Sequence, residues 1–324
     1  MSRVRIMGYI KNFKNIYEKN LFNFYLVETM EPYIFFFIFS FFSLFGYEHT
    51  VSIAAIFRDE APYLKEWIEF HLAIGVDHFY LTNHESQDDY LSVLKPYIDE
   101  GKVDLFQISG NPDSKAQWDL IQGAANLKSA KFALNQTEWM AFIDIDEFIF
   151  PVKDLNIEKF INRYQSYQSL CINWLEFGTS FIDKLDPHRL MLDQLVLRQS
   201  VGSKIVKNIV KLKYMNLSLQ AFTYSHIMPL KRGVNPVDVN GKVVCELIRS
   251  ETYLGDIIRI HHYALRDEAF FQNVKMNRPN VVCNEEKKNQ LYAKRIRTNQ
   301  KFDNSISIIA DKIRKKVFSN ENSL

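Results

Sequence analysis

The chain lacks the features that would assign it to several specialised classes of protein. Its 324 residues include only three cysteines, which are widely spaced and form no Cys-x-x-Cys pair. This spacing argues against a disulfide framework or a cysteine zinc site, and it suits a reducing compartment. The formal net charge is only +2, so no overall basic field points to a nucleic-acid partner.

The sequence also has no glycine-rich phosphate loop. No Gly-x-Gly-x-x-Gly follows the first apolar strand, and no Walker motif occurs anywhere in the chain. If the protein binds a nucleotide, we therefore expect side chains and a metal ion to hold it, and not a glycine-rich turn. With 47% hydrophobic and 24% charged residues, the composition is that of ordinary globular protein.

A long membrane-spanning run is missing as well. The uncharged apolar segment Tyr33 to Tyr47 is shorter than the ~20 residues that a helix needs to cross a bilayer, and it lies too far from Met1 for a signal peptide. It follows a basic amphipathic segment at residues 1–30. We expect this N-terminal part to make peripheral membrane contact, with the protein cytoplasmic and at the inner face of the membrane. A marginal span and a piece of buried core are the alternatives.

The most unusual stretch runs from Trp139 to Pro151, where three carboxylates stand in an otherwise apolar run. A carboxylate among apolar neighbours is costly unless a cation or several donors compensate it, so the group points to a metal. If the segment is a strand, Asp144 and Asp146 face the same side, roughly 6 to 7 Å apart. Such oxygen ligands suit Mg²⁺ or Mn²⁺. The alternative is an acidic strand end that caps a helix or lies in solvent.

From Thr50 onward, apolar strands alternate with amphipathic helices. This order predicts a doubly wound, mostly parallel sheet with helices on both faces and with ligands at the carboxyl ends of the strands. The predicted strands are Val51–Phe57, Val76–Thr82, Val103–Ile108 and Trp139–Ile145. The predicted helices are Pro62–Ile74, Tyr90–Ile98 and Lys115–Leu134. His71, on the apolar face of the first helix, is expected to be a core histidine and not a ligand.

After Pro151 the pattern is less regular. We expect helices at Ile157–Tyr164 and Pro187–Arg198, and strands at Leu170–Trp174, Lys204–Leu212, Ala221–Ile227 and Ile257–Tyr263. The chain is thus expected to divide into a basic and aromatic extension (1–48), an α/β domain (49–280) whose later part is smaller and mixed, and a basic helical tail (281–324).

Several short blocks, in order, make the chain resemble glycosyltransferase family 92 and related bacterial family 2-like proteins, which have the GT-A fold. The blocks are Arg58-Asp59-Glu60 with Glu66-Trp67; Asn83, Ser86 and Asp88; Asp144-Ile145-Asp146-Glu147-Phe148; Trp174-x-x-Phe177-Gly178-Thr179-Ser180; Lys204-Ile205-Val206; and His262-Tyr263 with Arg266-Asp267-Glu268 and Lys275-x-x-Arg278. The chain departs from the family at Asp59, where Asn is usual, and at His261, where an Asn often precedes the His-Tyr pair.

The resemblance implies an enzyme that transfers a hexose, commonly galactose from a UDP-sugar, to a hydroxyl of a glycan or glycolipid acceptor with inversion. The metal ligands it implies for Mn²⁺ or Mg²⁺ are Asp144, Asp146 and His262. The donor contacts it implies are Arg58, Asp59, Glu60, Asn83, Asp88, Asp144, Lys275 and Arg278. Inversion also needs a carboxylate to accept the proton of the attacking hydroxyl, and Asp193 is preferred to Glu176 for this role.

Each of these residues also has a plainer interpretation. His262 could be a buried histidine bonded to a backbone carbonyl, Lys275 and Arg278 a solvated helix face, Asn83 part of a loop, and Asp193 an exposed acid. Two other functions remain open at this point. One is a metal-dependent nucleotidyl- or phosphotransferase, and the other is a catalytically silent, membrane-associated, sugar-binding scaffold.

Overall fold

The computed structural model describes residues 46–112, 114–222, 226–246, 248–278, 281 and 284–319. The chain from Glu48 onward forms one compact unit. The predicted membrane-contacting part, including nearly all of Tyr33–Tyr47, lies outside the described residues. No helix within the described ranges is long and apolar enough to cross a membrane.

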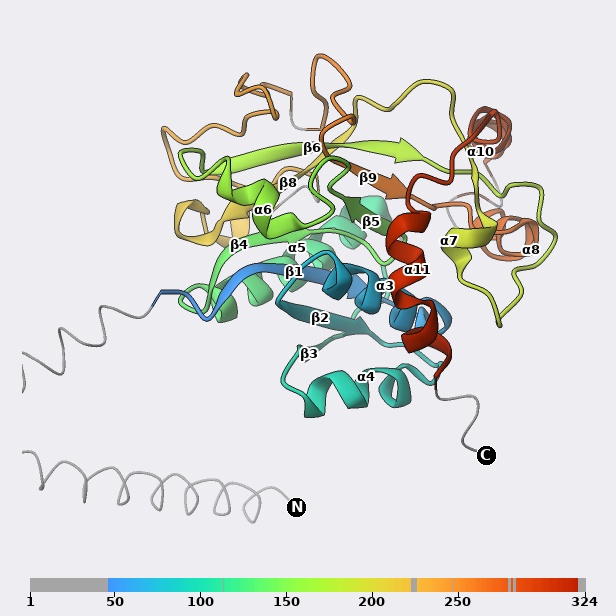
Figure 1. Cartoon of the computed structure of the whole chain (residues 1–324), viewed down its shortest axis with the longest axis horizontal. Coiled ribbons are helices and arrows are strands. Elements are labelled where there is room, and N and C mark those ends of the chain that lie inside the picture. Colours follow the sequence, from blue (N-terminus) through green and yellow to red (C-terminus); the bar gives the residue numbers. More distant parts are fainter. Residues whose placement is uncertain are drawn as a thin grey trace, which may run out of the picture. The chain divides into compact units, whose positions relative to one another are not determined.

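One eight-stranded sheet organises this unit, with the strand order β3-β2-β1-β4-β8-β6-β9-β5 (Figure 1). The strands are β1 (His49–Phe57), β2 (His78–His84), β3 (Val103–Ile108), β4 (Thr137–Phe142), β5 (Glu147–Phe150), β6 (Ser169–Glu176), β8 (Val206–Lys211) and β9 (Arg259–His262). Strands β1 to β4 are parallel, β8 is antiparallel to β4 and β6, and β9 is parallel to β6 but antiparallel to β5. A parallel half therefore continues into a mixed half, as predicted.

Helices cover both faces of the sheet, which confirms the predicted α/β class. The helices are α3 (Ala61–Ala73), α4 (Tyr90–Asp99), α5 (Lys115–Ala133), α6 (Ile157–Asn162), α7 (Met191–Gln194), α8 (Glu268–Phe270), α10 (Glu285–Arg297) and α11 (Ser307–Phe318). Leu64 of α3 and Leu94 of α4 belong to the core on one face. Leu127 of α5 packs with Met140 of β4 on the other face. Two short strands, β7 (Leu197–Arg198) and β10 (Lys301–Phe302), pair apart from the main sheet.

Strand β1 and helix α3 show why the sequence pattern predicts the secondary structure of the parallel half correctly. Residues 51–57 of β1 are all buried, because both faces of a parallel sheet are covered, and the continuous apolar run reflects this. Pro62 stands in the first turn of α3, where its missing N–H costs no hydrogen bond. Gly75 follows the helix with a φ of +92°, a conformation that glycine adopts without strain. The predicted helix end at Gly75 is confirmed.

Two predicted elements of the mixed half are wrong. The predicted helix Pro187–Arg198 contains only the four-residue α7, after which the chain extends into β7. The described residues of the predicted strand Ala221–Ile227 are not in a strand, and Ala221 ends a short 3₁₀ helix. In both segments, apolar spacing was the only signal, and tertiary contacts overrode it. The helical tail is present as α10 and α11, and α11 packs against α3.

His71 is a core histidine, as predicted. It is fully buried, and its ring joins α3 to β5. Nδ1 lies 2.8 Å from the carbonyl oxygen of Trp67, and the N–H of Ile149 donates to Nε2 over 3.2 Å. The ring is therefore neutral, with its proton on Nδ1. Burial lowers the pKa of His71 to about 3, although the bond to Trp67 acts in the opposite direction.

We predict that His71 makes the protein less stable as the pH falls below neutrality. The unfolded chain binds a proton at His71 below about pH 6.5, whereas the folded protein resists protonation, so acid favours unfolding. The stability advantage of the wild type over His71→Gln should shrink by about 2 kcal/mol between pH 7 and pH 5. Urea unfolding of both proteins at several pH values measures this. Parallel pH profiles would contradict the prediction.

Candidate active site

The acidic segment forms a turn between two strands and not the end of one strand. Strand β4 ends at Phe142, and the N–H of Glu147 donates to the carbonyl oxygen of Asp144 over 3.0 Å. The N–H of Asp144 donates in return to the carboxylate of Glu147, also over 3.0 Å. The predicted strand Trp139–Ile145 is therefore too long. The argument that strand alternation turns Asp144 and Asp146 to one side fails with it, because neither residue is in a strand. Asp144 pairs with Lys207 and Asp146 with His262.

Strand pairing brings Asp146 and Glu147 to a histidine from far along the chain. Glu147 begins β5 and lies opposite His262 of β9, and the N–H of Tyr263 donates to the carbonyl oxygen of Asp146 over 2.8 Å. Each of the residues Asp146, Glu147 and His262 offers one ligand atom, and these atoms all lie within 4.8 Å of one another. The indole N–H of Trp67 fixes the turn from α3 through a 2.8 Å bond to the carbonyl oxygen of Glu147.

Asp144 lies outside this group of three. Its Oδ2 is 2.8 Å from the ammonium of Lys207 on β8, and its Oδ1 accepts a 3.1 Å bond from Gln122 of α5. Lys207 is also 3.0 Å from Glu147 Oε2. Glu147, which was not among the predicted ligands, thus lies with Asp146 and His262, while Asp144 pairs with Lys207. A metal-ligand role for Asp144 stays a prediction. The sequence did carry a signal for Lys207, since a lysine inside an apolar strand needs an acidic partner.

Burial and nearby charged side chains set the pKa values of Asp146, Glu147 and His262. Burial opposes ionisation of Asp146, but His262 and Lys275 hold the pKa of its carboxyl group well below the usual value. Burial lowers the pKa of His262, against the charge of Asp146. Burial also raises the pKa of Glu147 to about 8, although Lys207 opposes this. The low pKa of Asp146 favours its carboxylate form, and a cation bound at Glu147 or His262 would displace the proton of that group.

The group has the chemistry of a divalent-cation site. Glu147 Oε1 and the Nδ1 of His262 are buried and have no hydrogen-bond partner among the described residues. A cation held by this group would give Glu147 Oε1 a partner, since buried polar atoms are normally paired. His262 faces Asp146 through its other nitrogen, Nε2, which is 3.6 Å from Asp146 Oδ1. Two carboxylates with one imidazole fit Mn²⁺ well, and they fit Mg²⁺ with the histidine as its less preferred ligand.

Three of the residues predicted to contact the sugar donor lie around Asp146, namely Lys275, Arg278 and Glu60. Lys275 Nζ is 3.9 Å from Asp146 Oδ2, and burial lowers the pKa of Lys275 to about 8, with Arg278 adding to the effect. Arg278 is exposed, and its charge, like those of Asp146 and Lys275, acts on Glu60. The carboxylate of Glu60 accepts a 2.7 Å bond from the buried guanidinium of Arg266. Two pairs of opposite charge, Lys275 with Asp146 and Arg266 with Glu60, therefore lie beside the candidate metal site.

Four residues predicted to contact the donor follow the first two strands, and three of them form hydrogen bonds with nearby loop and helix residues. The four residues are Arg58, Asp59, Asn83 and Asp88. The N–H of Asp59 donates to the Ser86 hydroxyl over 2.9 Å, and the N–H of Ser86 donates to Asn83 Oδ1 over 3.0 Å. Asp88 Oδ2 accepts a 2.7 Å bond from the N–H of Ala61 at the start of α3. These bonds build the loops. A contact of these residues with the donor stays a prediction.

Glu176 stands next to the candidate metal-binding group. It ends β6, and in the parallel pairing of β6 with β9 it lies beside His262. Lys294 and Arg297 of α10 hold its carboxylate at 2.6 Å and 2.8 Å. Burial opposes ionisation of Glu176, but Lys294 lowers the pKa of its carboxyl group below the usual value. Neither cation was among the predicted site residues, because α10 carries a regular charge pattern that resembles a solvated helix.

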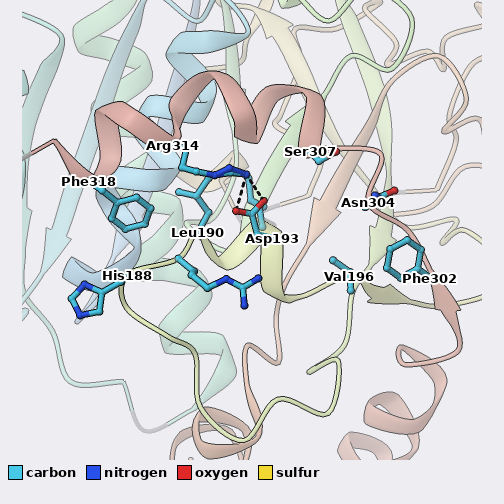
Figure 2. Close-up of a pocket in the computed structure, with 11 residues that line it drawn as sticks. His188, Leu190, Asp193, Val196, Phe302, Asn304, Ser307, Arg314 and Phe318 are labelled. Atoms are coloured by element: carbon cyan, nitrogen blue, oxygen red, sulfur yellow. Dashed lines mark hydrogen bonds and ion pairs between the residues drawn. The ribbon is translucent and has the colours of Figure 1, made fainter.

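Asp193 lies in a cavity of about 490 Å³ between α7 and α11. Figure 2 shows its carboxylate facing the guanidinium of Arg314, with Phe318 and Phe302 at opposite ends of the cavity. Both oxygens of Asp193 are 3.0 Å from Nη2 of Arg314. The residues that line this cavity do not include Asp146, Glu147 or His262.

The helix that carries Asp193 is nevertheless tied to the charged residues around Asp146. The carboxylate of Glu66 accepts bonds of 2.8 Å and 2.9 Å from the N–H groups of Met191 and Leu192. Nη1 of Arg266 is 3.3 Å from the sulfur of Met191. These contacts give a physical reason for the Glu66-Trp67 block, because Glu66 positions α7 while Trp67 holds the acidic turn.

Known proteins similar to this chain are glycosyltransferases. A glycosyltransferase family 92 protein from Ricinus communis is 30% identical over 136 residues, which are 41% of this chain and 23% of that protein. Galactan beta-1,4-galactosyltransferase GALS3 from Arabidopsis thaliana is 22% identical over 138 residues, or 41% of this chain and 27% of that protein. The chain thus spans about a quarter of the length of these relatives.

The chain was also compared with solved structures and with family models. TarS from S. aureus, solved in complex with UDP, aligns with a TM-score of 0.34 and 12% identity over 59% of this chain and 60% of that one. The sheet order and the helices on both faces agree with the GT-A type of fold that the sequence predicts. The family model of glycosyltransferase family 92 matches residues 47–249. The chain therefore belongs to glycosyltransferase family 92.

Proposed function

We propose that the protein is a metal-dependent glycosyltransferase that transfers a hexose from a nucleotide sugar to a hydroxyl of a glycan acceptor with inversion. The observation that carries this proposal is the group of Asp146, Glu147 and His262, in which Glu147 Oε1 is buried and has no hydrogen-bond partner in the described part of the chain, within a chain of this family. The relative named as a galactan beta-1,4-galactosyltransferase supports galactose as the sugar, and we propose UDP as its carrier.

In this proposal, Asp146, Glu147 and His262 hold Mn²⁺ or Mg²⁺. When bound, the ion stabilises the negative charge that collects on the diphosphate as the glycosidic bond to the sugar breaks. Lys275, 3.9 Å from Asp146, and Arg278 bind the oxygens of the same diphosphate. The Glu60–Arg266 pair keeps this charged region in place. Asp144, which is 38% exposed at its side chain, contacts the ribose or the base.

Asp193 accepts the proton of the attacking hydroxyl in the proposed reaction. Its cavity has a size typical of small-ligand sites. Phe302 and Phe318 offer apolar ring faces there, and Asn304 and Arg314 offer polar groups, a combination that suits a sugar. Glu176 remains the alternative base. Two cations hold the carboxylate of Glu176 and weaken it as a base, whereas Asp193 has the one guanidinium of Arg314.

The first test is hydrolysis of nucleotide sugars by the full chain in the presence of Mn²⁺. We expect slow release of nucleoside diphosphate from one preferred donor, with UDP-galactose as the first candidate, and loss of this release on adding EDTA. A nucleotidyl- or phosphotransferase would act on a nucleoside triphosphate instead. A silent scaffold would act on neither. Either of these two results contradicts the proposed function.

The second test is Asp146→Asn. We predict that turnover of the preferred donor falls by roughly 100- to 1,000-fold, because the variant loses a charged ligand that acts on the departing group. The side chain keeps its size, so the fold should persist. Thermal denaturation checks this, and Mn²⁺ should raise the melting temperature of the wild type but not of the variant. Full turnover in Asp146→Asn would reject the metal assignment.

The third test separates the base from its surroundings. Asp193→Asn should lower kcat for transfer to a β-1,4-linked galacto-oligosaccharide by about 100- to 10,000-fold and leave the KM for the donor unchanged, because only proton removal is lost. Asp311→Asn is the matched control. Asp311 contacts the same guanidinium of Arg314 at 3.0 Å, but its side chain is 70% exposed, and the variant should behave as the wild type. Equal kcat values for the two variants would exclude Asp193 as the base.

A further inference from the structure

A buried lysine stands between two of the three acids of the turn. The side chain of Lys207 is 2% exposed, and its ammonium lies 2.8 Å from Asp144 Oδ2 and 3.0 Å from Glu147 Oε2. It comes from β8, and all residues of that strand are buried. A buried ammonium is costly unless its partners are close and well oriented. The geometry of Lys207 therefore fixes the positions of both carboxylates.

Lys207 makes the two oxygens of Glu147 different from each other. Oε2 faces Lys207 and also accepts a 3.0 Å bond from the N–H of Asp144. Oε1 is buried and has no hydrogen-bond partner among the described residues. With Oε2 occupied by two donors, the carboxylate cannot rotate freely, and Oε1 is the oxygen left for a cation held by Asp146 and His262.

Lys207 also keeps Asp144 away from that cation. Asp144 and Asp146 are two residues apart, but Asp144 pairs with Lys207 on β8 and with Gln122 on α5. Asp146 instead faces His262 on β9, at 3.6 Å. For Asp144 to become a ligand, its contact with the ammonium of Lys207 would have to break. A short Asp-x-Asp motif therefore contributes only its second acid to the group.

We propose that Lys207 is a positioning residue that selects the metal ligands: it holds Glu147 with Oε1 toward the cation and keeps Asp144 out of the coordination shell. This inference rests on the metal site of the proposed function and deepens it. The residues that support a ligand from outside the shell commonly change metal affinity by about 10- to 100-fold when they are replaced.

The test measures binding of Mn²⁺ alone to the full chain by electron paramagnetic resonance, which needs no substrate and no turnover. Lys207→Met should weaken Mn²⁺ binding by about 10- to 100-fold. Lys211→Met is the matched control. Lys211 lies on the same strand, is 9% exposed at its side chain, and pairs with Glu138 at 3.4 Å, so its loss removes a similar buried cation elsewhere. Lys211→Met should bind Mn²⁺ as the wild type does.

A second variant keeps the proposal testable if Lys207→Met does not fold. Asp144→Asn leaves Lys207 paired with Glu147 at 3.0 Å, and thermal denaturation checks that it folds. Asp144→Asn should bind Mn²⁺ within about threefold of the wild type, because Asp144 is not a ligand. Loss of binding as severe as in Asp146→Asn would overturn the proposal. Unchanged or tighter binding by Lys207→Met would also overturn it, since Lys207 would then be neutral toward the ion or compete with it.

These outcomes separate the inference from the function on which it rests. If the wild type binds no Mn²⁺, the metal assignment fails, and the role of Lys207 fails with it. If the wild type binds Mn²⁺ and both lysine variants bind equally well, only the role of Lys207 is rejected. Release of nucleoside diphosphate by the wild type then still stands as evidence for the transferase.

Discussion

The structure depends on acidic side chains that are buried together at one end of a sheet and whose charges are compensated by cations. Glu147 is completely buried and Glu176 almost so, and each would be costly there as an isolated charge. Lys207 comes from β8 and Lys294 from α10 to pair with them. The acidic site can exist only because segments far apart in the sequence supply cations to it. Its geometry is therefore a property of the whole fold and not of one motif.

Strand pairing in the mixed half of the sheet brings these segments together. Strand β9 lies between β5 and β6, so His262 has Glu147 on one side and Glu176 on the other. Residues directly opposite each other in neighbouring strands project from the same face. The three side chains thus meet although more than eighty residues separate Glu176 from His262. The parallel half contributes the rigid support, through Trp67 of α3 and the end of β4.

The sequence predicted the parallel half well, because each of its elements carries its own periodic signal. The strand ending at Phe57 and the helix ending before Gly75 are examples. It also identified Asp146 and His262 as partners. It could not reveal that the chain turns after Phe142, because Ile143 and Ile145 continue the apolar pattern of the strand. Lys207 was missed for a related reason: its acidic partners become neighbours only through the antiparallel pairing of β8 with β4.

The way α10 is attached has a consequence for how the protein responds to its surroundings. None of its residues is buried, and its cations Lys294 and Arg297 reach Glu176 from the surface. Salt bridges of partly exposed side chains weaken as the salt concentration rises. The Debye length, over which salt screens such charges, is about 8 Å at physiological ionic strength. Since Glu176 adjoins His262, the salt concentration of the solution acts through this surface helix on the end of the sheet that carries the candidate metal site.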